Sequence, residues 1–357
     1  MSALNKGHYP SAPPTGHHWL RVKKYRKLTD ESVQIFFEVP EPLAGLFHFQ
    51  SGQHLDVVIY NGTDVLRRSY SICSGPGEPL SIAVKRIKGG LVSGFLNTSV
   101  REGDYLAVSA PHGSFILNEN ARHITMFAAG SGITPLLSML KFAVVRHIRV
   151  TLIYGNQTVA ATMFRQDLSE FHNVKTVYLL SRENREGYLN GRISEGTLST
   201  LTSSDSSILA SDEFYICGPA EMITSVRNFL EKSGCRAEHI HQEFFHAPVT
   251  PQSSTPKFPD VHAIPEYSLQ LVLEGDKHTI IVKSPDASLL DAALRQGINA
   301  PFSCKNGVCG SCRAKVLKGS VVMRANYALT DEEINDNYVL TCQSKPTCSD
   351  LSISFDA

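Results

Sequence analysis

Short stretches of alternating apolar and polar residues dominate the chain from residue 19 to about 118. β-branched and aromatic residues fill the apolar positions at 33–37, 54–59, 80–84 and 105–108. Turn signals, among them Asn61-Gly62, separate these stretches. A period of two places every second side chain on the same face of a strand, so this part of the chain predicts an antiparallel β-barrel.

The pattern changes after residue 120 to continuous apolar runs that alternate with helical periodicity. Strand-like runs lie at 123–129, 150–154, 174–180 and 213–217, and helical stretches lie at 135–145, 163–171 and 220–232. Buried strands that alternate with helices along the chain are typical of a doubly wound parallel sheet. The sequence therefore predicts an α/β domain at 121–247, after a barrel domain at 19–120.

Two other segments carry no apolar periodicity. Residues 1–18 contain proline and histidine without a core pattern, and 248–266 is rich in proline and polar residues. We expect a flexible N-terminal tail and a semi-rigid, extended linker. Residues 267–357 indicate two strands, a helix at 289–296 that Ser288 caps, and a loop. This part predicts a small α+β domain of the β-grasp, ferredoxin-like type, which makes the fold class multidomain.

Composition narrows the classes of function. The 357 residues are 42% apolar and carry a formal net charge of +0, with basic residues scattered along the chain. Nucleic-acid binding therefore has no electrostatic basis. The longest apolar stretch, around 124–145, is interrupted by Gly130, Gly132 and Pro135, and no leader-like segment precedes Trp19. We expect a soluble cytoplasmic protein with neither a nucleic-acid nor a membrane partner.

Four cysteines give the strongest chemical signal. Cys304, Cys309 and Cys312 share one short loop and Cys342 follows further along, which is the spacing C-x4-C-x2-C…C. Three thiolates on a tight loop and a distant fourth are the ligand set of a plant-type [2Fe-2S] cluster. Glycines between them let the backbone curl around an inorganic core and point its N–H groups at the sulfurs. Such a cluster transfers single electrons.

Zinc and a redox dithiol are the alternative interpretations of these cysteines. A four-cysteine zinc site usually has two C-x2-C pairs, and here only Cys309 and Cys312 form one. A redox C-x-x-C should begin a helix, whereas 313–317 has the character of a strand. The cluster is favoured over both. The remaining cysteines lie singly in apolar or helix-end contexts, which suits a reducing cytoplasm.

A flavin site is predicted at the end of a barrel strand, at Arg68-x-Tyr70-Ser71. Arg68 and Tyr70 share a face, where an arginine can neutralise a diphosphate and a tyrosine can pack against an isoalloxazine ring. Ser71 can hydrogen-bond the flavin edge. Gly90 and Ser93 lie at the start of a predicted helix that offers free N–H groups to a phosphate. The alternative is a plain strand with a surface arginine.

A nucleotide site is predicted at the first strand-to-helix turn of the α/β domain. Glycines and a proline mark this turn, in Gly130-Ser131-Gly132-Ile133-Thr134-Pro135. They let a pyrophosphate approach the N-terminus of the helix. Cys217-Gly218-Pro219 ends a later strand, at the edge where α/β folds bind ligands. Cys217 is either a small core residue or a neighbour of the nicotinamide.

The end of another strand bears on the choice between NADPH and NADH. Ser181-Arg182 stands there, and an arginine can pair bidentately with a 2′-phosphate. The acidic residue that usually binds a free ribose is absent from 154–157. These features favour NADPH, with a solvated surface arginine as the alternative.

The order of these motifs, followed by Glu243-x-Phe245 and the terminal cysteine spacing, resembles the ferredoxin-NADP reductase superfamily with a fused plant-type ferredoxin. Within it, the sequence is similar to the reductase subunits of bacterial phenylacetyl-CoA epoxidase at 66–73, 152–156, 291–297 and 338–343. The resemblance implies FAD, NADPH and a di-iron oxygenase as electron acceptor. It also implies catalytic roles for Tyr70, Ser71, Cys217 and Glu243, and a cofactor contact for Phe245. Ser181-Arg182 is not shared by all relatives, so the choice of nucleotide rests on this chain's own residues.

Together the predicted sites form one electron path. Nicotinamides give up two electrons as hydride and a cluster accepts one at a time, so a flavin must lie between them. We expect an NAD(P)H-dependent reductase that uses FAD, with FMN as the alternative, and serves a separate oxygenase. The resemblance implies that this oxygenase acts on phenylacetyl-CoA in phenylacetate catabolism. The alternatives are a reductase for a steroid or Rieske-type ring hydroxylase, and a non-enzymatic iron-sulfur redox sensor.

The docking face for the oxygenase is expected around the cluster loop, at 301–311. An acidic run, Asp331-Glu332-Glu333, follows in the same domain. It either steers a basic patch of the partner or forms the solvated first turn of a helix that Thr330 caps. The sequence leaves both interpretations open.

Overall fold

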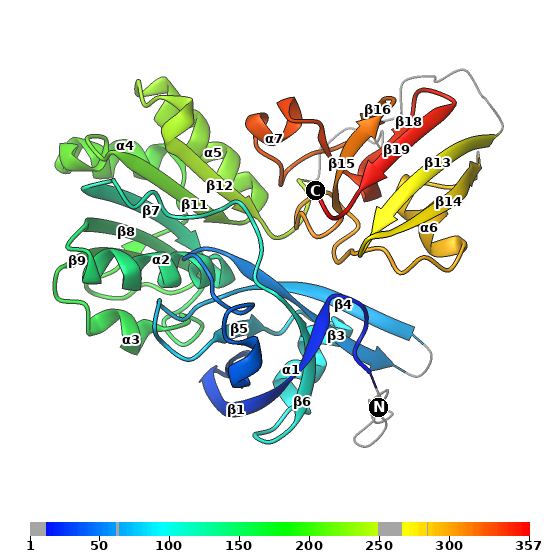
Figure 1. The fold of residues 1–357 in the computed structure, drawn as a ribbon. Helices are drawn as coiled ribbons and strands as arrows, with labels where there is room; N and C mark the ends of the chain where they lie inside the picture. The colour runs from blue at the N-terminus through cyan, green and yellow to red at the C-terminus, as the bar shows by residue number, and fades with distance from the viewer. Residues whose placement is uncertain (1–11, 62–63, 249–265, 284) are drawn as a thin grey trace. The chain divides into compact units, whose positions relative to one another are not determined.

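The computed structural model describes residues 12–61, 64–248, 266–283 and 285–357 (Figure 1). The chain divides into two compact units, Met1–Phe245 and His246–Ala357. The predicted tail up to residue 11 and the predicted linker from 249 to 265 lie outside the described residues. The first unit contains both the barrel and the α/β sheet.

Six antiparallel strands build the barrel of the first unit, in the order β4-β3-β6-β1-β2-β5. Their bounds are β1 His17–Thr29, β2 Ser32–Glu38, β3 His54–Asn61, β4 Asp64–Ser71, β5 Ser81–Lys85 and β6 Tyr105–Ser109, with the short helices η1 Glu41–Leu43 and α1 Leu91–Thr98. An isolated bridge between Ile72 and Ile82 joins the end of β4 to β5. Alternating side chains such as Leu20, Ile35 and Leu55 are fully buried in the core. The predicted antiparallel barrel is confirmed.

The first strand begins earlier than the sequence pattern indicates. His17 and His18, which fall in the predicted tail, pair with Ser109 and Val108 across the ladder between β1 and β6. The Nδ1 atom of the buried His17 also lies 2.9 Å from the carbonyl oxygen of Thr15. Two adjacent histidines show no apolar alternation, so the backbone pairing with β6 alone identifies them as strand residues.

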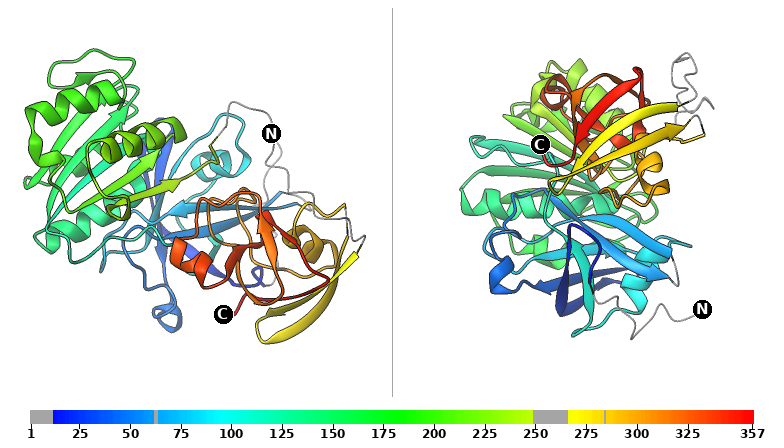
Figure 2. Two further views of the ribbon diagram at one scale, coloured as in Figure 1. Left: turned by 90° about the horizontal axis from the view of Figure 1, so that it is seen from above. Right: turned by 45° about the vertical axis from the view of Figure 1, so that its right-hand side comes forward.

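Six parallel strands form the second sheet of this unit, in the order β10-β9-β8-β7-β11-β12. The strands are β7 His123–Ala129, β8 Arg149–Asn156, β9 Val174–Leu180, β10 Leu189–Asn190, β11 Glu213–Gly218 and β12 Ile240–Phe244. The helices are α2 Ile133–Val145, α3 Arg165–Ser169, α4 Glu195–Ser204 and α5 Ala220–Lys232, with the 3-10 turns η2 Gly130–Gly132, η3 Ser206–Ile208 and η4 Ala237–His239. Figures 1 and 2 show helices on both faces of the sheet, as the prediction of a doubly wound domain requires.

Polar contacts join the barrel to the parallel sheet. Arg26 Nη2 donates to Asp167 Oδ1 at 2.7 Å, and Ser138 Oγ donates to the carbonyl oxygen of Ser74 at 2.7 Å. Both contacts connect residues of the barrel or its loops with a helix of the α/β sheet. The first contact joins β1 to α3, and the second holds the loop after β4 against α2, the helix that follows the carboxyl end of β7, where such sheets bind ligands.

The second unit is a β-grasp domain. Its five-stranded sheet has the order β14-β13-β19-β15-β17, in which β13 and β19 are parallel. The elements are β13 Glu266–Leu273, β14 Asp276–Lys283, α6 Leu289–Arg295, β15 Arg313–Lys318, β16 Val321–Met323, α7 Asp331–Asn335, β17 Tyr338–Leu340, η5 Thr341–Gln343, β18 Ser344–Pro346 and β19 Asp350–Ser354. Ser288 Oγ accepts a hydrogen bond from Asp291 N at 3.1 Å, which confirms the predicted cap of α6.

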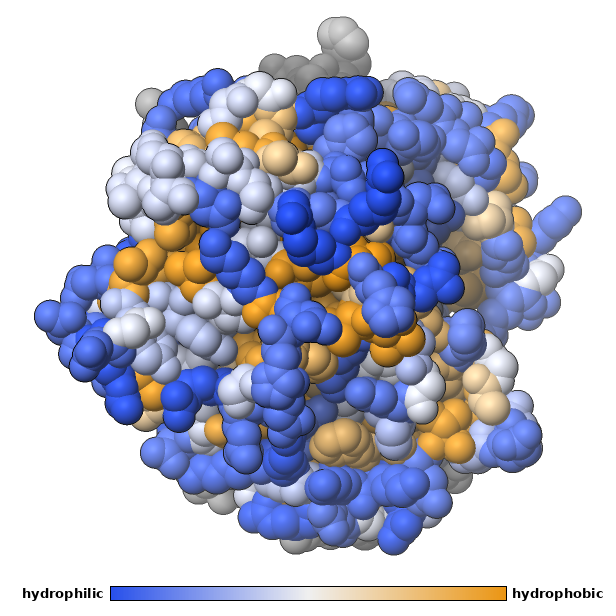
Figure 3. All heavy atoms as spheres, turned by 90° about the vertical axis from the view of Figure 1, so that its left-hand side faces the viewer, coloured by the Kyte–Doolittle hydropathy of each residue, from blue (hydrophilic) through white to orange (hydrophobic). Residues whose placement is uncertain are grey.

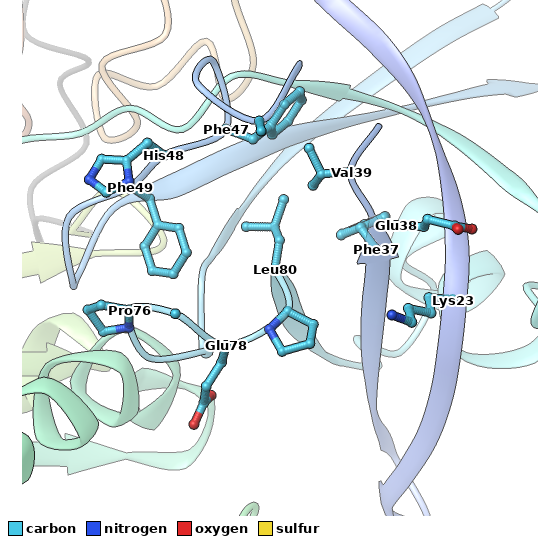
Figure 4. A pocket seen from close by; sticks show the side chains of 13 residues that line it. Lys23, Phe37, Glu38, Val39, Phe47, His48, Phe49, Pro76, Glu78 and Leu80 are labelled. Carbon is cyan, nitrogen blue, oxygen red and sulfur yellow. The ribbon is translucent and has the colours of Figure 1, made fainter. Parts of the chain in front are cut away.

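Hydrophilic residues cover most of the face shown in Figure 3, and apolar residues show between them. Among the described residues, no helix is long and apolar enough to span a membrane. A cavity of about 580 Å³ opens in the barrel, with Phe37, Phe47 and Leu80 among its lining residues (Figure 4). None of the predicted site residues lines this cavity.

Candidate functional site

In the second unit, the four predicted cluster ligands lie in two pairs. The thiol of Cys304 hydrogen-bonds that of Cys309, and the thiol of Cys312 hydrogen-bonds that of Cys342. In the part of the chain that the structure describes, no three His, Cys, Asp or Glu side chains surround a single metal position. A two-iron cluster takes two thiolates at each iron, whereas zinc takes four ligands around one point. The paired arrangement therefore fits the cluster.

Hydrogen-bond donors surround the paired sulfurs. Asn306 N lies 3.3 Å from Cys304 Sγ, Ser311 Oγ lies 3.1 Å from Cys309 Sγ, and Gln343 Nε2 lies 3.3 Å from Cys342 Sγ. The hydrogen bond with Cys309 lowers the pKa of Cys304 to about 6, although burial acts in the opposite direction. The hydrogen bond with Cys312 likewise lowers the pKa of Cys342. The contacts at Cys304 and Cys342 favour the thiolate, which is the form that binds iron, whereas the hydrogen bond with Cys342 and burial raise the pKa of Cys312.

Glycine is required where the cluster loop turns. Gly307 and Gly310 have φ values of 77° and 72°, in the left-handed region. A Cβ on Gly307 would lie 3.1 Å from Gln343 Cγ and 3.3 Å from the carbonyl oxygen of Ala325. The glycines let the backbone curl as the sequence predicted, so the residues present could hold a cluster.

On the barrel, Arg68 and Tyr70 extend from the same face of β4. Arg68 is exposed and its Nη1 donates to the carbonyl oxygen of Arg67 at 2.7 Å, while burial raises the pKa of Tyr70. No side chain caps the first turn of α1, which follows Gly90 and contacts β4 and β5. A Cβ on Gly90 would lie 2.6 Å from Ser93 Oγ. An exposed arginine and open helix N–H groups fit the diphosphate of FAD.

Three of the four predicted catalytic residues come together where β4 reaches the parallel sheet. Ser71 Oγ donates to Glu243 Oε2 at 3.3 Å, and Cys217 pairs with Glu243 in the ladder between β11 and β12. Burial raises the pKa of Glu243 to about 8, with the Ser71 hydrogen bond opposing it. Burial, and then the neighbouring Glu243, raises the pKa of the Cys217 thiol. The fourth predicted residue, Tyr70, directly precedes Ser71 on β4.

The predicted nucleotide loop lies beside this group. A Cβ on Gly132 would collide with the carbonyl of Cys217, so only glycine lets η2 pack against β11. No side chain caps α2, in whose first turn Thr134 Oγ1 donates to the carbonyl oxygen of Ser131 at 3.0 Å and Pro135 follows. Gly218 ends β11 and Pro219 is the N-cap of α5, while Phe245 packs against the core of the α/β sheet. The open α2 N-terminus fits a pyrophosphate.

Ser181 and Arg182 lie directly after β9. Their N–H groups donate to the carbonyl oxygens of Asn156 and Gln157, each at 2.9 Å, which ties this turn to the end of β8. The side chain of Arg182 is exposed. A cation is therefore available at the carboxyl edge of the sheet.

Sequence reasoning missed one residue of this region. His54 Nδ1 lies 3.8 Å from Glu243 Oε1, and both side chains are almost completely buried. The sequence placed His54 only within an alternating barrel strand. Its proximity to Glu243 depends on the packing of β3 against β12, which no local pattern encodes.

Three family models match the chain. They are described as an oxidoreductase FAD-binding domain at residues 20–116, an oxidoreductase NAD-binding domain at 126–228, and a 2Fe-2S iron-sulfur cluster binding domain at 271–347. The matches confirm FAD, a nicotinamide nucleotide and a [2Fe-2S] cluster as the cofactors, and they favour the cluster over zinc.

Relatives match over nearly the whole chain. The protein is 37% identical to a subunit of the 1,2-phenylacetyl-CoA epoxidase of Escherichia coli (strain K12), over 96% of this chain and 99% of that protein. It is 29% identical to the ferredoxin reductase component of 3-ketosteroid-9-alpha-monooxygenase from Rhodococcus rhodochrous, over 94% of this chain and 96% of that protein. Phthalate dioxygenase reductase has the same fold, with a TM-score of 0.60 at 24% identity, over 95% of this chain and 98% of that one. The chain thus belongs to the family of this phenylacetyl-CoA epoxidase component, reductases of the ferredoxin-NADP reductase type with a C-terminal plant-type ferredoxin domain.

Proposed function

We propose that this oxidoreductase carries electrons from NADPH through FAD and the [2Fe-2S] cluster to the di-iron oxygenase of a phenylacetyl-CoA epoxidase. The proposal rests on two contacts of Glu243, the hydrogen bond from Ser71 and the strand pairing with Cys217. These contacts join the predicted flavin strand β4 to the predicted nucleotide-binding edge of the parallel sheet. A relative named as a component of 1,2-phenylacetyl-CoA epoxidase and relatives named as reductase components of monooxygenases support an oxygenase as the acceptor.

Each predicted flavin residue has a distinct task in this proposal. Arg68 and the α1 N-terminus, with Gly90 and Ser93, bind the diphosphate of FAD. Tyr70 packs against the ring, and Ser71 Oγ, whose hydrogen points at Glu243, accepts a hydrogen bond at the edge of the ring. When bound, FAD accepts hydride as an electron pair and releases electrons singly.

At the nucleotide, Gly130 and Gly132 let the pyrophosphate approach α2, and Cys217 lies beside the nicotinamide. Its raised pKa keeps the Cys217 thiol neutral, so it offers the ring a small uncharged contact. Glu243 is mostly protonated below a pH of about 8 and holds a proton one hydrogen bond from Ser71. Ser71 and Glu243 exclude water from the site because both of their side chains are buried.

Arg182→Ala should raise the KM for NADPH more than the KM for NADH. Only NADPH carries the 2′-phosphate, and a lost charge-assisted hydrogen bond costs about 1.5–3 kcal/mol, which corresponds to roughly tenfold or more in KM. Steady-state reduction of a dye acceptor with each nucleotide measures the effect. Arg236→Ala, an exposed arginine paired with Glu238, is the matched control. Equal losses for both nucleotides would show that Arg182 does not discriminate between them.

The acidic run on α7 yields a prediction about docking. Glu333 completes a capping box with Thr330 and lies 3.3 Å from Arg313 Nη1, so its charge is already engaged. Asp331→Asn combined with Glu332→Gln should slow electron delivery to the oxygenase at low salt, and the difference should vanish at high salt. Dye reduction by NADPH should stay unchanged, since it occurs upstream. Stopped-flow measurements across ionic strengths test this, and salt-independent rates in both proteins would exclude steering by these residues.

The identity of the acceptor is tested by reconstitution. We expect the purified protein, the di-iron components of a phenylacetyl-CoA epoxidase and NADPH to oxygenate phenylacetyl-CoA. The oxygenase of 3-ketosteroid 9α-hydroxylation, supplied at the same concentration, should give much slower turnover. Faster electron delivery to the steroid oxygenase would contradict the proposed acceptor, but it would not contradict the path from NADPH through FAD to the cluster.

A further inference from the structure

A buried amide beside one predicted cluster ligand has no task in the proposed function. Gln343 directly follows Cys342, and only 2% of its surface is exposed. Its Nε2 lies 3.3 Å from Cys342 Sγ, 3.0 Å from the carbonyl oxygen of Cys342 and 2.9 Å from the carbonyl oxygen of Lys305. The amide nitrogen is therefore placed between the cysteine loop and the sulfur of the most distant ligand.

Arg324 holds the other end of this amide. Its Nε donates a hydrogen bond to Gln343 Oε1 at 2.8 Å. An arginine side chain can only donate, so the atom that faces it is the amide oxygen, and the amide nitrogen faces Cys342 and Lys305. Nε2 carries two hydrogens and only one of them can point at the carbonyl oxygen of Lys305. The other hydrogen is left for the two acceptors of Cys342.

The fold sets Arg324 opposite Gln343. Strands β16 and β18 form an antiparallel ladder that includes the pair Met323 and Ser344, and one position further on Arg324 N donates to the carbonyl oxygen of Gln343 at 2.9 Å. Residues directly opposite in such a ladder place their side chains on the same face. Gln343 also packs against the cysteine loop at Gly307, where a Cβ would lie 3.1 Å from Gln343 Cγ. Two separate segments thus fix the orientation of the amide.

An N–H group that points at a ligand sulfur matters most when the cluster is reduced. Reduction adds one electron, which NADPH supplies through FAD, and it adds one negative charge without making or breaking a bond to a ligand. Hydrogen bonds to the sulfurs are among the features that set the reduction potential of such a cluster. A cation that polarises the donating amide strengthens its hydrogen bond.

We propose that Gln343 and Arg324 raise the reduction potential of the cluster. Gln343 donates to the sulfur of Cys342, and Arg324 is the positioning residue that orients and polarises the amide. The donor stabilises the reduced cluster more than the oxidised cluster, because the reduced cluster carries the additional negative charge. This inference rests on the proposed function, because it requires Cys342 to be a cluster ligand on the electron path.

The connection to Arg324 distinguishes this donor from one within the cysteine loop. Ser311 Oγ lies 3.1 Å from Cys309 Sγ, and Ser311 belongs to the loop that carries this cysteine. Gln343 instead joins Cys342 to an arginine that directly follows β16. A substitution at Arg324 therefore changes the hydrogen bond at the sulfur without altering the cysteine loop itself.

A redox titration of the full-length holoprotein, followed by electron paramagnetic resonance of the reduced cluster, tests the proposal. Gln343→Met keeps a side chain of similar length and removes the amide. We expect it to lower the equilibrium constant for reduction of the cluster about tenfold, comparable with the lower end of what the loss of a hydrogen-bond partner of a metal ligand costs. For one electron, tenfold corresponds to a fall of about 59 mV in the midpoint potential. Gln270→Met, at an exposed glutamine of β13, is the control and should keep the wild-type potential.

Variants of Arg324 show whether it acts through Gln343. Arg324→Met should lower the potential by less than Gln343→Met does, and Arg324→Lys should recover part of this shift, because an ammonium group can also donate to the amide oxygen. The double variant should fall by less than the sum of the two single shifts, since both substitutions act on one hydrogen-bond chain. Fully additive shifts would overturn the role of Arg324 as a positioning residue.

Iron and acid-labile sulfide analysis separates an effect on the potential from loss of the cluster. A Gln343→Met protein with a full cluster and the wild-type potential would overturn the proposal. If Gln343→Met loses its cluster, the decision passes to Arg324→Met, whose wild-type potential at full iron content would overturn it equally. Wild-type protein that binds no iron and sulfide would instead overturn the proposed function.

Discussion

Cys309→Ala should abolish the cluster and reduce electron delivery to a one-electron acceptor by more than about 100-fold, while NADPH still reduces the bound flavin. Cys309 is paired with Cys304 and accepts a hydrogen bond from Ser311 Oγ, so its loss removes one thiolate from one iron. Mutation of a residue that only hydrogen-bonds a metal ligand typically lowers metal affinity or activity by about 10–100-fold, and loss of a ligand itself should lower them further. Hydride transfer lies upstream and does not need the cluster.

Iron and acid-labile sulfide analysis, with the rate of reduction of a one-electron acceptor, measures this effect. About two irons and two sulfides per chain are expected in the wild-type protein. Cys348→Ala is the matched control, because Cys348 belongs to the same unit but to neither sulfur pair. A Cys309→Ala protein with full iron content would contradict the assignment of the ligands, and stoichiometric zinc in the wild type would remove the electron exit altogether.

Flavin reduction by NADPH should slow as the pH rises through about 8, and Glu243→Gln should remove this dependence. Below that pH the buried carboxyl is neutral, and above it the carboxyl ionises beside the path of a negatively charged hydride. Two unit charges about 4 Å apart at an effective dielectric constant of about 20 interact by about 4 kcal/mol. Even a third of this energy corresponds to about tenfold in rate.

Anaerobic stopped-flow measurements over a pH series test this second effect. The rate constant of wild-type flavin reduction should fall at least about tenfold above the transition, and that of the glutamine variant should stay level. Glu238→Gln, an exposed glutamate of the same sheet domain, should keep the wild-type profile. The same profile in the Glu243→Gln and wild-type proteins would show that another group controls the rate.

Local signals carried the prediction of three of the four cluster ligands. Cys304, Cys309 and Cys312 share one loop, so their spacing along the chain nearly fixes their spacing in the fold. Gly307 and Gly310 added the backbone freedom that the structure uses, with φ values in the left-handed region. A candidate site built mostly within one loop can therefore be proposed from the sequence, although Cys342 comes from a separate segment, η5.

The site around Glu243 shows the limit of such reasoning. Ser71 and Glu243 are far apart in the chain, and only the packing of the barrel against the parallel sheet brings them within 3.3 Å. Both residues were predicted from the sequence: Ser71 from its place in the motif Arg68-x-Tyr70-Ser71, and Glu243 only from the family resemblance. His54 carried no signal at all, because its position in an alternating strand says nothing about what it faces across a domain boundary.

Secondary structure was missed where side chains gave weak patterns. Helix α4, Glu195–Ser204, is rich in serine and threonine and buries only Leu198, so it lacks the apolar stripe that indicates a helix. Helix α3 is shorter than the predicted 163–171, because Phe164 has a φ of 56° and the helix can begin only after it. Tertiary packing, rather than local preference, set both elements.

Anaerobic addition of NADPH, followed by absorbance of the flavin and electron paramagnetic resonance of the cluster, tests the electron path most directly. We predict that the flavin bleaches first, and that the signal of a one-electron-reduced [2Fe-2S] cluster then appears in the wild-type protein but not in Cys309→Ala. A flavin that NADPH reduces without any subsequent cluster signal in the wild type would contradict the path from NADPH through FAD to the cluster.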